Sequence, residues 1–411
     1  MFLRRQLIFH NRFKDYKIVF LNQSILGRSW QLDLQVDLAQ TSGPCFSYST
    51  VENAKCIGNL TIQSTPFYHK KSRLSRVFSW LSYFIYTSFH IIFSHAKPFP
   101  LLFIFSNPQI MPWFGYLMKR IFRQKYVVLV LDIYPDILVR MEILSEKNFL
   151  TKIWRYMNHL AFHNADHIFT LTEIMKRNIE PMVSNDGSKP HPPITVIPPG
   201  VDTNWIRPLS KEHNRFALSY KQESKFTLIY SGNLGTVHDT DTIISSIKIL
   251  KDDVKIHFMF IVQGSKKTLL KKEIKRHDLS NVTLLPFQDE TVLPYSLTSG
   301  DVAIVTLDKR VDGLCIPGKV ITMMSAGLAI LAICDPDGEL ANIVVKTGCG
   351  MTVPPGDIEG FVSAVRTFKS NKDLLRQCQE NSRKAASEHF SREVIFKQYL
   401  NVIIPLIEQK S

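Results

Sequence analysis

Apolar and polar residues follow two periods along this chain, one typical of buried strands and one typical of amphipathic helices. Short apolar runs bounded by turn residues predict strands at 16–21, 45–50, 60–64, 100–105, 126–131, 165–172, 194–197, 227–230, 255–262, 282–285, 301–307 and 329–334. Segments with helical spacing predict helices at 30–39, 73–94, 113–122, 153–162, 173–179, 243–250, 290–297, 320–326 and 338–345. The alternation of strand and helix predicts an α/β protein built on parallel sheets.

The length of 411 residues suggests two domains rather than one. Residues 181–193 are rich in proline and polar residues, and Pro198-Pro199-Gly200 follows shortly after. We therefore expect a linker near residue 200, a first domain over 1–200 and a second over 201–390. The second domain carries a run of βα repeats that is typical of a Rossmann-like domain.

The stretch 226–250 is the most informative part of the chain, since an apolar strand runs into Ser231-Gly232-Asn233-Leu234-Gly235 and then into a helical pattern. Glycines at 232 and 235 allow a tight turn and a close approach of a ligand. We expect the following helix to offer an open N-terminus to an anion, with His238, Asp239 or Thr240 as its cap. A plain βα turn without a ligand is the alternative.

Other strand ends should lie at the same edge of this sheet, at Gly264, Pro286, Asp308 and Asp335. Lys319 opens a predicted helix, where a cation meets the dipole unfavourably unless an anion is bound there too. Asp132 follows a predicted strand of the first domain, where open α/β sheets place their ligands. A solvated surface lysine and a turn-capping aspartate are the alternatives.

The net charge of +14 implies an acidic partner, and its distribution is uneven. From Asn53 to Leu131 there are ten Lys or Arg and no Asp or Glu, around the apolar, aromatic helix at 73–94. Its basic flank (Lys70, Lys71, Arg73 and Arg76) favours a helix in a membrane interface, with Trp80 and Phe84 in contact with lipid. A core helix, a spanning helix and a nucleic-acid surface are the alternatives, although no nucleic-acid-binding motif accompanies the charges.

The six cysteines are scattered without a metal-ligand or disulfide pattern, which indicates a reducing cytoplasm. Asp239-Thr240-Asp241 has the spacing of a metal motif only by its position at a helix start. We therefore expect no metal site. The apolar stretch near the N-terminus is too short and too interrupted for a secretory signal.

Together these motifs resemble glycosyltransferase family 4, in the bacterial surface-polysaccharide branch that includes fucosaminyl and colanic-acid glycosyltransferases. The residues that carry the resemblance are 230–235 with His238-Asp239, 197–202, Pro317-Gly318-Lys319 with Ser325-Ala326-Gly327, Asp335 with Gly338-Glu339, 131–136, 165–167 and 390–392. The resemblance implies the GT-B fold, in which two Rossmann-like domains face each other across a cleft. Residues 391–411 would then form a C-terminal helix that packs back on the first domain.

The resemblance also implies which residues bind the substrates. A nucleotide-diphosphate sugar would lie in the second domain and the acceptor in the first. The diphosphate would be held by Gly232, Asn233, Leu234, Gly235, His238 and Lys319, the base would be flanked by Gly264 and Pro286, and the sugar would be approached by Asp312, Gly313, Leu314, Thr322 and Glu339.

Two departures from the family pattern concern this site. Leu314 and Thr322 stand where the family has a pair of glutamates, and Val237 and His238 stand where many relatives carry Arg and Lys. Lys319 would then be the main cation for the leaving diphosphate, with Asp132 as the catalytic base.

We therefore expect a metal-independent, retaining glycosyltransferase of polysaccharide biosynthesis without a cofactor, peripheral to the inner face of the cytoplasmic membrane. We expect its acceptor to be a lipid-linked or free saccharide, with the lipid-linked form as our first choice, and we expect no binding of nucleic acid. A non-catalytic membrane-associated scaffold and a sugar-nucleotide epimerase stay open as alternatives.

Overall fold

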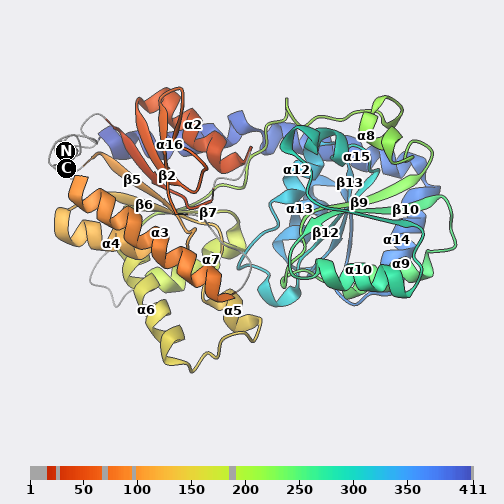
Figure 1. The fold of residues 1–411 in the computed structure, drawn as a ribbon, viewed down its shortest axis with the longest axis horizontal. Coiled ribbons are helices and arrows are strands. Elements are labelled where there is room, and N and C mark those ends of the chain that lie inside the picture. The colour runs from red at the N-terminus through yellow and green to blue at the C-terminus, as the bar shows by residue number, and fades with distance from the viewer. Residues whose placement is uncertain (1–15, 25–27, 67–72, 95–98, 185–190, 409–411) are drawn as a thin grey trace. The chain divides into compact units, whose positions relative to one another are not determined.

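The computed structural model describes residues 16–24, 28–66, 73–94, 99–184 and 191–408 of the chain. Contacts divide the chain into two compact units, drawn in Figure 1. Unit 1 comprises Met1–Pro198 and Ile395–Ser411, and unit 2 comprises Pro199–Val394. Each unit is an α/β layer structure, and each is described below by itself.

Unit 1 is built on an eight-stranded sheet with the strand order β3-β4-β2-β1-β5-β6-β7-β8. Its strands are β1 (Ile18–Leu21), β2 (Cys45–Ser49), β3 (Lys55–Ile57), β4 (Leu60–Ser64), β5 (Leu101–Phe105), β6 (Tyr126–Val130), β7 (His167–Thr170) and β8 (Ile194–Val196). All neighbours pair in parallel except β3 and β4, which form an antiparallel hairpin at one edge. The hairpin strand β3 is not predicted from the sequence, because Lys55-Cys56-Ile57 is too short and too exposed to show a strand pattern.

Helices cover both faces of this sheet (Figure 1). They are α2 (Trp30–Ser42), α3 (Arg73–Ser94), α4 (Met111–Phe122), α5 (Asp136–Arg140), α6 (Phe149–His163), α7 (Glu173–Val183) and α16 (Arg392–Glu408). Neighbouring residues of β5 point to opposite faces, because side chains alternate along a strand. Phe103 packs against Tyr399 of α16, while Ile104 lies against Gly115 of α4. The C-terminal helix is therefore part of the core of unit 1.

Unit 2 is built on a six-stranded, fully parallel sheet with the order β11-β10-β9-β12-β13-β14. The strands are β9 (Phe226–Asn233), β10 (Ile256–Gln263), β11 (Val282–Leu285), β12 (Val302–Thr306), β13 (Ala329–Ile333) and β14 (Gly350–Val353). The helices are α8 (Arg215–Ser219), α9 (Asp241–Ile249), α10 (Lys267–Arg276), α11 (Leu293–Leu297), α12 (Lys319–Ser325), α13 (Glu339–Thr347), α14 (Ile358–Ser370) and α15 (Lys372–His389). Short 3-10 turns occupy Lys211–His213, Glu290–Val292 and Lys309–Val311.

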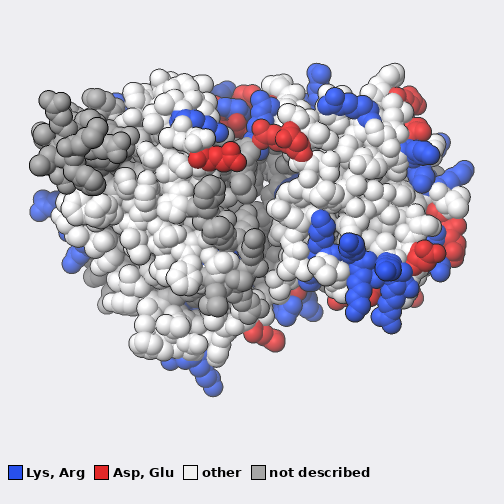
Figure 2. All heavy atoms as spheres, viewed as in Figure 1, with Lys and Arg blue, Asp and Glu red and all other residues white. Residues whose placement is uncertain are grey.

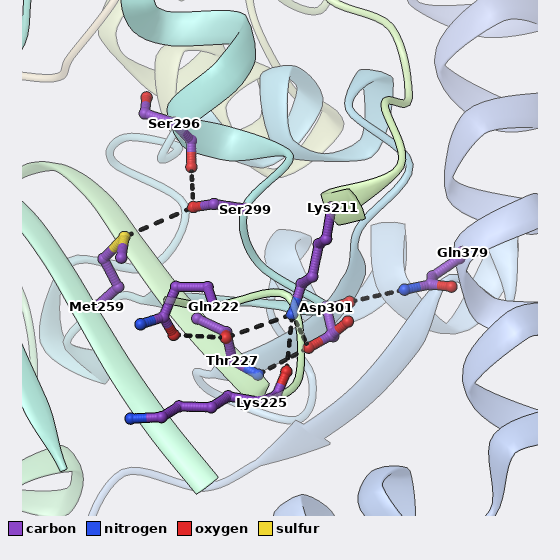
Figure 3. A network of polar contacts seen from close by, with 9 residues as sticks. All are labelled: Lys211, Gln222, Lys225, Thr227, Met259, Ser296, Ser299, Asp301 and Gln379. Carbon is purple, nitrogen blue, oxygen red and sulfur yellow. Dashed lines mark hydrogen bonds and ion pairs between the residues drawn. The ribbon is translucent and has the colours of Figure 1, made fainter. Parts of the chain in front are cut away.

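Lys211 and Asp301 form an ion pair that fixes the start of unit 2 to its sheet. The Lys211 ammonium lies 2.5 Å from the Asp301 carboxylate and also donates to the Lys225 carbonyl at 2.9 Å (Figure 3). The same carboxylate accepts the backbone N–H of Thr227 at 2.7 Å, and Gln379 of α15 donates to the Asp301 carbonyl. These contacts join four segments at the amino ends of β9 and β12. They therefore lie at the edge of the sheet opposite to the carboxyl ends of its strands.

Candidate functional site

The carboxyl ends of the strands of unit 2 bring the predicted site residues to one edge. Gly232 is the residue before the last of β9, Gly264 follows β10, Pro286 follows β11, and Asp308 and Asp335 follow β12 and β13. Because all six strands run in parallel, these positions share one side of the sheet, as the sequence predicts.

The glycine turn, residues Ser231–Gly235, is held between the ends of β9 and β10. Leu234 donates its N–H to the Gln263 carbonyl at 2.7 Å, and its own carbonyl accepts the N–H of Lys266 at 3.0 Å. Gly264 has a positive φ of 118°, and a Cβ there would lie 2.6 Å from both the Asn233 Oδ1 and the Leu234 carbonyl oxygen. Only glycine fits this close approach, so Gly264 shapes the turn directly.

His238 closes the turn from its other side. The Gly235 N–H donates to His238 Nδ1 at 3.1 Å, and the histidine side chain is buried. Burial, together with the nearby Lys319, lowers the pKa of His238 to about 3. The imidazole is therefore neutral and supplies no cation to the turn.

Helix α9 does not offer the open N-terminus that the sequence suggests. It begins at Asp241, and Leu234–Thr240 separate it from β9. The Asp239 carboxylate accepts the N–H groups of Asp241 and Thr242 at 3.0 and 3.1 Å. Asp239 thus caps the helix as predicted, but in doing so it occupies the donors that an anion would need.

Lys319 lies over the glycine turn from the first position of α12. Its ammonium donates to the Tyr230 hydroxyl, lies 3.9 Å from the centre of the Tyr230 ring, and is 3.5 Å from the Asn233 carbonyl oxygen. A Cβ at Gly232 would lie 3.5 Å from Lys319 Nζ, and Gly232 has a positive φ of 140°. Gly232 therefore lies directly against the lysine side chain, and its positive φ is what favours glycine at this position.

Lys266 is a second cation at the turn, and the sequence analysis misses it. Its side chain donates to the His238 carbonyl at 2.5 Å, and its N–H donates to Leu234. The sequence does contain a signal for Lys266, since it directly follows Gln263-Gly264-Ser265. This segment comes after a predicted strand whose end lies at the same sheet edge. Lys266 therefore places a second positive charge next to His238.

The predicted sugar-side residues are spread over three neighbouring segments. The Asp312 carboxylate lies against Gly338, where a Cβ would be 2.4 Å from its Oδ1, so it stands beside Glu339 at the start of α13. Leu314 is only 2% exposed, and its side chain belongs to the core rather than to an accessible site. Thr322 lies on α12, one turn after Lys319. Gly313 adopts a positive φ of 72° in the same loop, and Pro286 is exposed after β11.

Asp132 belongs to unit 1 and follows β6, at the carboxyl edge of the eight-stranded sheet. Burial raises the pKa of Asp132 to about 6. A carboxylate with a raised pKa is able to exchange a proton near neutral pH.

Among the described residues, no group of three His, Cys, Asp or Glu side chains is placed to hold a metal ion. Asp239 is used as a helix cap, as shown above. Metal-independent chemistry stays a prediction.

Residues 211–385 match the family model described as "Glycosyl transferases group 1". This segment contains the glycine turn, Gly264, Lys319 and Glu339. The domain belongs to the group 1 glycosyltransferases. The chain is accordingly an enzyme of the glycosyltransferase class, and the match decides against a sugar-nucleotide epimerase.

Two relatives of this glycosyltransferase are similar over much of its length. The probable glycosyltransferase WbjE of Pseudomonas aeruginosa is 23% identical over 74% of this chain and 74% of its own. The putative colanic acid biosynthesis glycosyl transferase WcaI of Escherichia coli K12 is 23% identical over 59% of this chain and 58% of its own.

A solved structure shows the same fold. Anabaena Alr3699/HepE in complex with UDP matches with a TM-score of 0.69 at 15% identity, and the match covers 95% of this chain and 100% of that one. The fold is thus GT-B, as the resemblance implies.

We expect a nucleoside diphosphate to stabilise the glycosyltransferase and Lys319→Ala to abolish most of this effect, because the variant removes the cation over the glycine turn. A ligand at 100 times its dissociation constant adds about 2.7 kcal/mol to the free energy of unfolding. Thermal unfolding with and without UDP, GDP or dTDP measures the effect. Lys346→Ala, an exposed lysine of α13, is the control. If every nucleotide stabilised wild type and Lys319→Ala equally, the prediction that the diphosphate binds at Lys319 would be wrong.

Proposed function

We propose that this enzyme transfers a sugar, with retention of configuration, from a nucleotide-diphosphate sugar to a lipid-linked saccharide during polysaccharide biosynthesis. Unit 2 would bind the donor and unit 1 the acceptor. The observation that carries the proposal is the Lys319 ammonium over the glycine turn, inside the segment that matches the glycosyl transferases. The name of WcaI, a putative colanic acid glycosyl transferase, supports polysaccharide biosynthesis.

The donor site fits a leaving nucleoside diphosphate. Sugar transfer builds negative charge on the diphosphate, and preorganised cations and N–H groups lower the barrier by stabilising that charge. Lys319 and Lys266 lie on either side of the glycine turn and would supply the positive charge. UDP is our first choice of nucleotide, because HepE was solved with it.

Transfer should not need a metal ion, since the two lysines supply the charge. We expect undiminished activity in EDTA. Loss of activity on chelation and its return with Mg²⁺ would contradict this mechanism.

Asp132 is our candidate for the group that takes the proton from the acceptor hydroxyl. Its carboxylate follows β6 at the ligand-binding edge of unit 1, and its raised pKa shows that the fold disfavours the charged form. An ordinary aspartate has a pKa near 3.9 in the unfolded chain, so the folded protein takes up a proton between about pH 4 and pH 6. The cost of keeping Asp132 ionised is then fully present above about pH 6.

We therefore expect Asp132→Asn to stabilise the protein by about 3 kcal/mol at neutral pH while greatly reducing transfer. The gain in stability should grow from pH 4 to pH 6 and then stay constant. Urea unfolding over this pH range measures it, with Glu180→Gln, an exposed carboxylate of α7, as the control. A variant that gains stability and keeps full activity would exclude Asp132 as the base.

Helix α3 supports association with a membrane, because one of its faces is apolar and exposed. Phe78 is 73% exposed, Phe93 is 65% exposed, and Val77, Leu81, Ile85 and Phe89 form the same stripe at a spacing of four residues. Trp80 and Phe84, which the sequence analysis assigns to lipid, face inward instead and pack on Trp154 and Phe114. None of the described helices combines the length and apolarity needed to cross a membrane.

The exposed apolar surface continues from α3 onto α4 and α6. Its further members are Leu117 and Ile121 of α4 and Phe149, Leu150, Ile153 and Tyr156 of α6. Partly buried aromatic rings join the three helices, since Trp154 of α6 contacts both Trp80 of α3 and Trp113 of α4. Figure 1 shows these helices together on one side of the sheet. We call this surface the apolar face. Contiguous exposed apolar patches of this kind often mark a site of interaction with a membrane or another protein.

Basic side chains surround the apolar face. Arg76, Arg120, Arg123, Lys147 and Lys152 are exposed on or beside its helices. In the view of Figure 2 the surface over α3 carries few charged groups, and Lys and Arg stand at the margins of unit 1. Lys70 and Lys71 lie outside the described residues. An apolar centre with a basic rim suits an anionic lipid surface.

Hydrogen bonds tie α3 to the edge of the sheet where the acceptor is expected. Gln23, after β1, donates to the Ser79 carbonyl at 2.8 Å, and the Tyr83 hydroxyl donates to the Tyr48 carbonyl of β2 at 2.8 Å. Trp80 contacts Tyr134, two residues after Asp132. Helix α3 thus carries the apolar face on one side and contacts the segment just after Asp132 with the other. The six free cysteines fit the reducing cytoplasmic side of the membrane.

We expect the protein to sediment with vesicles of phosphatidylcholine and phosphatidylglycerol, and the binding to weaken but persist in about 1 M NaCl, where the Debye length is about 3 Å. Phe78→Ser combined with Phe93→Ser should remove the salt-resistant part. Arg76→Gln, Arg120→Gln and Arg123→Gln together should remove the salt-sensitive part.

The matched control for the apolar variants is Val254→Ser with Val345→Ser, since both valines are exposed in unit 2. Failure of the wild type to sediment at low salt would contradict membrane association. A dimer in solution that the Phe78 and Phe93 changes dissociate would instead assign the apolar face to a second copy of the chain.

A further inference from the structure

The ammonium of Lys319 is held by a tyrosine and not by a carboxylate. No ion pair within 4.0 Å involves Lys319 among the described residues. Its printed polar contacts are the Tyr230 hydroxyl and, at 3.5 Å, the Asn233 carbonyl oxygen, and the Tyr230 ring lies beneath it. A buried or partly buried lysine normally has a charged partner, so this arrangement needs an explanation.

Tyr230 is itself rigidly placed. Its ring is fully buried in the core of unit 2, stacked on Phe260 and edge-on to His238. Its hydroxyl accepts from Lys319 and donates to the Asn233 carbonyl at 2.9 Å. One side chain therefore connects the lysine of α12 with the glycine turn of β9.

We propose that Tyr230 is the positioning residue for donor binding: its hydroxyl and ring hold the Lys319 side chain over the glycine turn before the nucleotide arrives. This inference rests on the proposed diphosphate site and adds to it a residue that the sequence analysis does not assign. A flexible lysine loses rotamer entropy when it binds an anion, and a rigid partner removes part of that cost beforehand.

A neutral partner has an advantage over a carboxylate in this position. An aspartate or glutamate would hold the lysine more tightly but would compete with the incoming diphosphate for the same charge. A phenol hydroxyl and an aromatic face orient the ammonium and leave its net charge uncompensated. The diphosphate then becomes the first full counter-charge that Lys319 meets.

Donor binding should therefore be coupled to proton uptake. Burial lowers the pKa of Lys319 to about 7, so the free protein holds this lysine partly neutral. The titratable groups around it are Tyr230, which stays protonated, and His238, which stays neutral. Lys266 stands behind His238 and adds positive charge. A bound diphosphate raises the pKa of Lys319 again, because it favours the charged form.

Calorimetric titration with UDP and with inorganic pyrophosphate, in two buffers of different ionisation enthalpy, counts the protons taken up. At about pH 7 the wild type should take up roughly half a proton through Lys319, and at about pH 8 close to one. Tyr230→Phe keeps the ring and removes the acceptor, so the charged lysine loses a hydrogen bond. We expect about tenfold weaker binding and a larger proton uptake at pH 7 than in the wild type.

Tyr126→Phe is the matched control, since the Tyr126 hydroxyl also donates to a buried carbonyl, that of Ala161, but in unit 1. It should leave affinity and proton uptake unchanged. Tyr230→Phe with wild-type affinity, or with weaker binding but unchanged proton uptake, would overturn the positioning role while the diphosphate site stands. A wild type that binds neither UDP nor pyrophosphate would overturn the proposed donor site, and the role of Tyr230 with it.

Discussion

The proposed donor site depends on the Lys319 ammonium, which lies beside the glycine turn and has no carboxylate within 4.0 Å among the described residues. Lys319 lies against Gly232, whose positive φ favours glycine, and its hydrogen-bond partner is Tyr230 rather than an acid, so a diphosphate would be its first full counter-charge. Other parts of unit 2 fix the position of the glycine turn beside Lys319. The parallel sheet collects the strand ends at one edge, Gly264 packs against Leu234, and His238 closes the turn with its ring nitrogen. The ion pair of Lys211 and Asp301 lies at the other edge, away from the site.

Unit 1 combines two features that a lipid-linked acceptor would need. They are the apolar face and the carboxyl edge of the sheet, where Asp132 lies. The inner face of α3 is hydrogen-bonded to the sheet, since Gln23 after β1 donates to the Ser79 carbonyl and the Tyr83 hydroxyl donates to the Tyr48 carbonyl of β2, while its outer face is apolar and exposed. One helix thus connects the proposed membrane contact with the neighbourhood of Asp132. Membrane binding would explain why no Asp or Glu occurs from Asn53 to Leu131, because carboxylates there would be repelled by an anionic lipid surface.

Periodicity and the positions of the strand ends predict most of the fold from sequence, together with the sheet edge at which we propose the donor site. The glycine turn, Gly264 and Lys319 are local signals, and each lies where it is expected. The contacts that refine the site are not local. Asp239 rather than an anion occupies the start of α9, Lys266 reaches His238 across 28 residues, and Tyr230 meets Lys319 across 89. Helical spacing also cannot tell which face of α3 is buried, because both faces are apolar. The sequence therefore predicts Trp80 and Phe84 in contact with lipid, whereas they pack on Trp154 and Phe114.

The central claim is that the diphosphate of the donor lies between the glycine turn and Lys319. The most direct test is a crystal structure of the protein with UDP bound. The account predicts diphosphate oxygens at hydrogen-bonding distance, about 2.7–3.2 Å, from Lys319 Nζ and from backbone N–H groups of the glycine turn. A diphosphate bound elsewhere, with Lys319 still on Tyr230 and the turn empty, would contradict it.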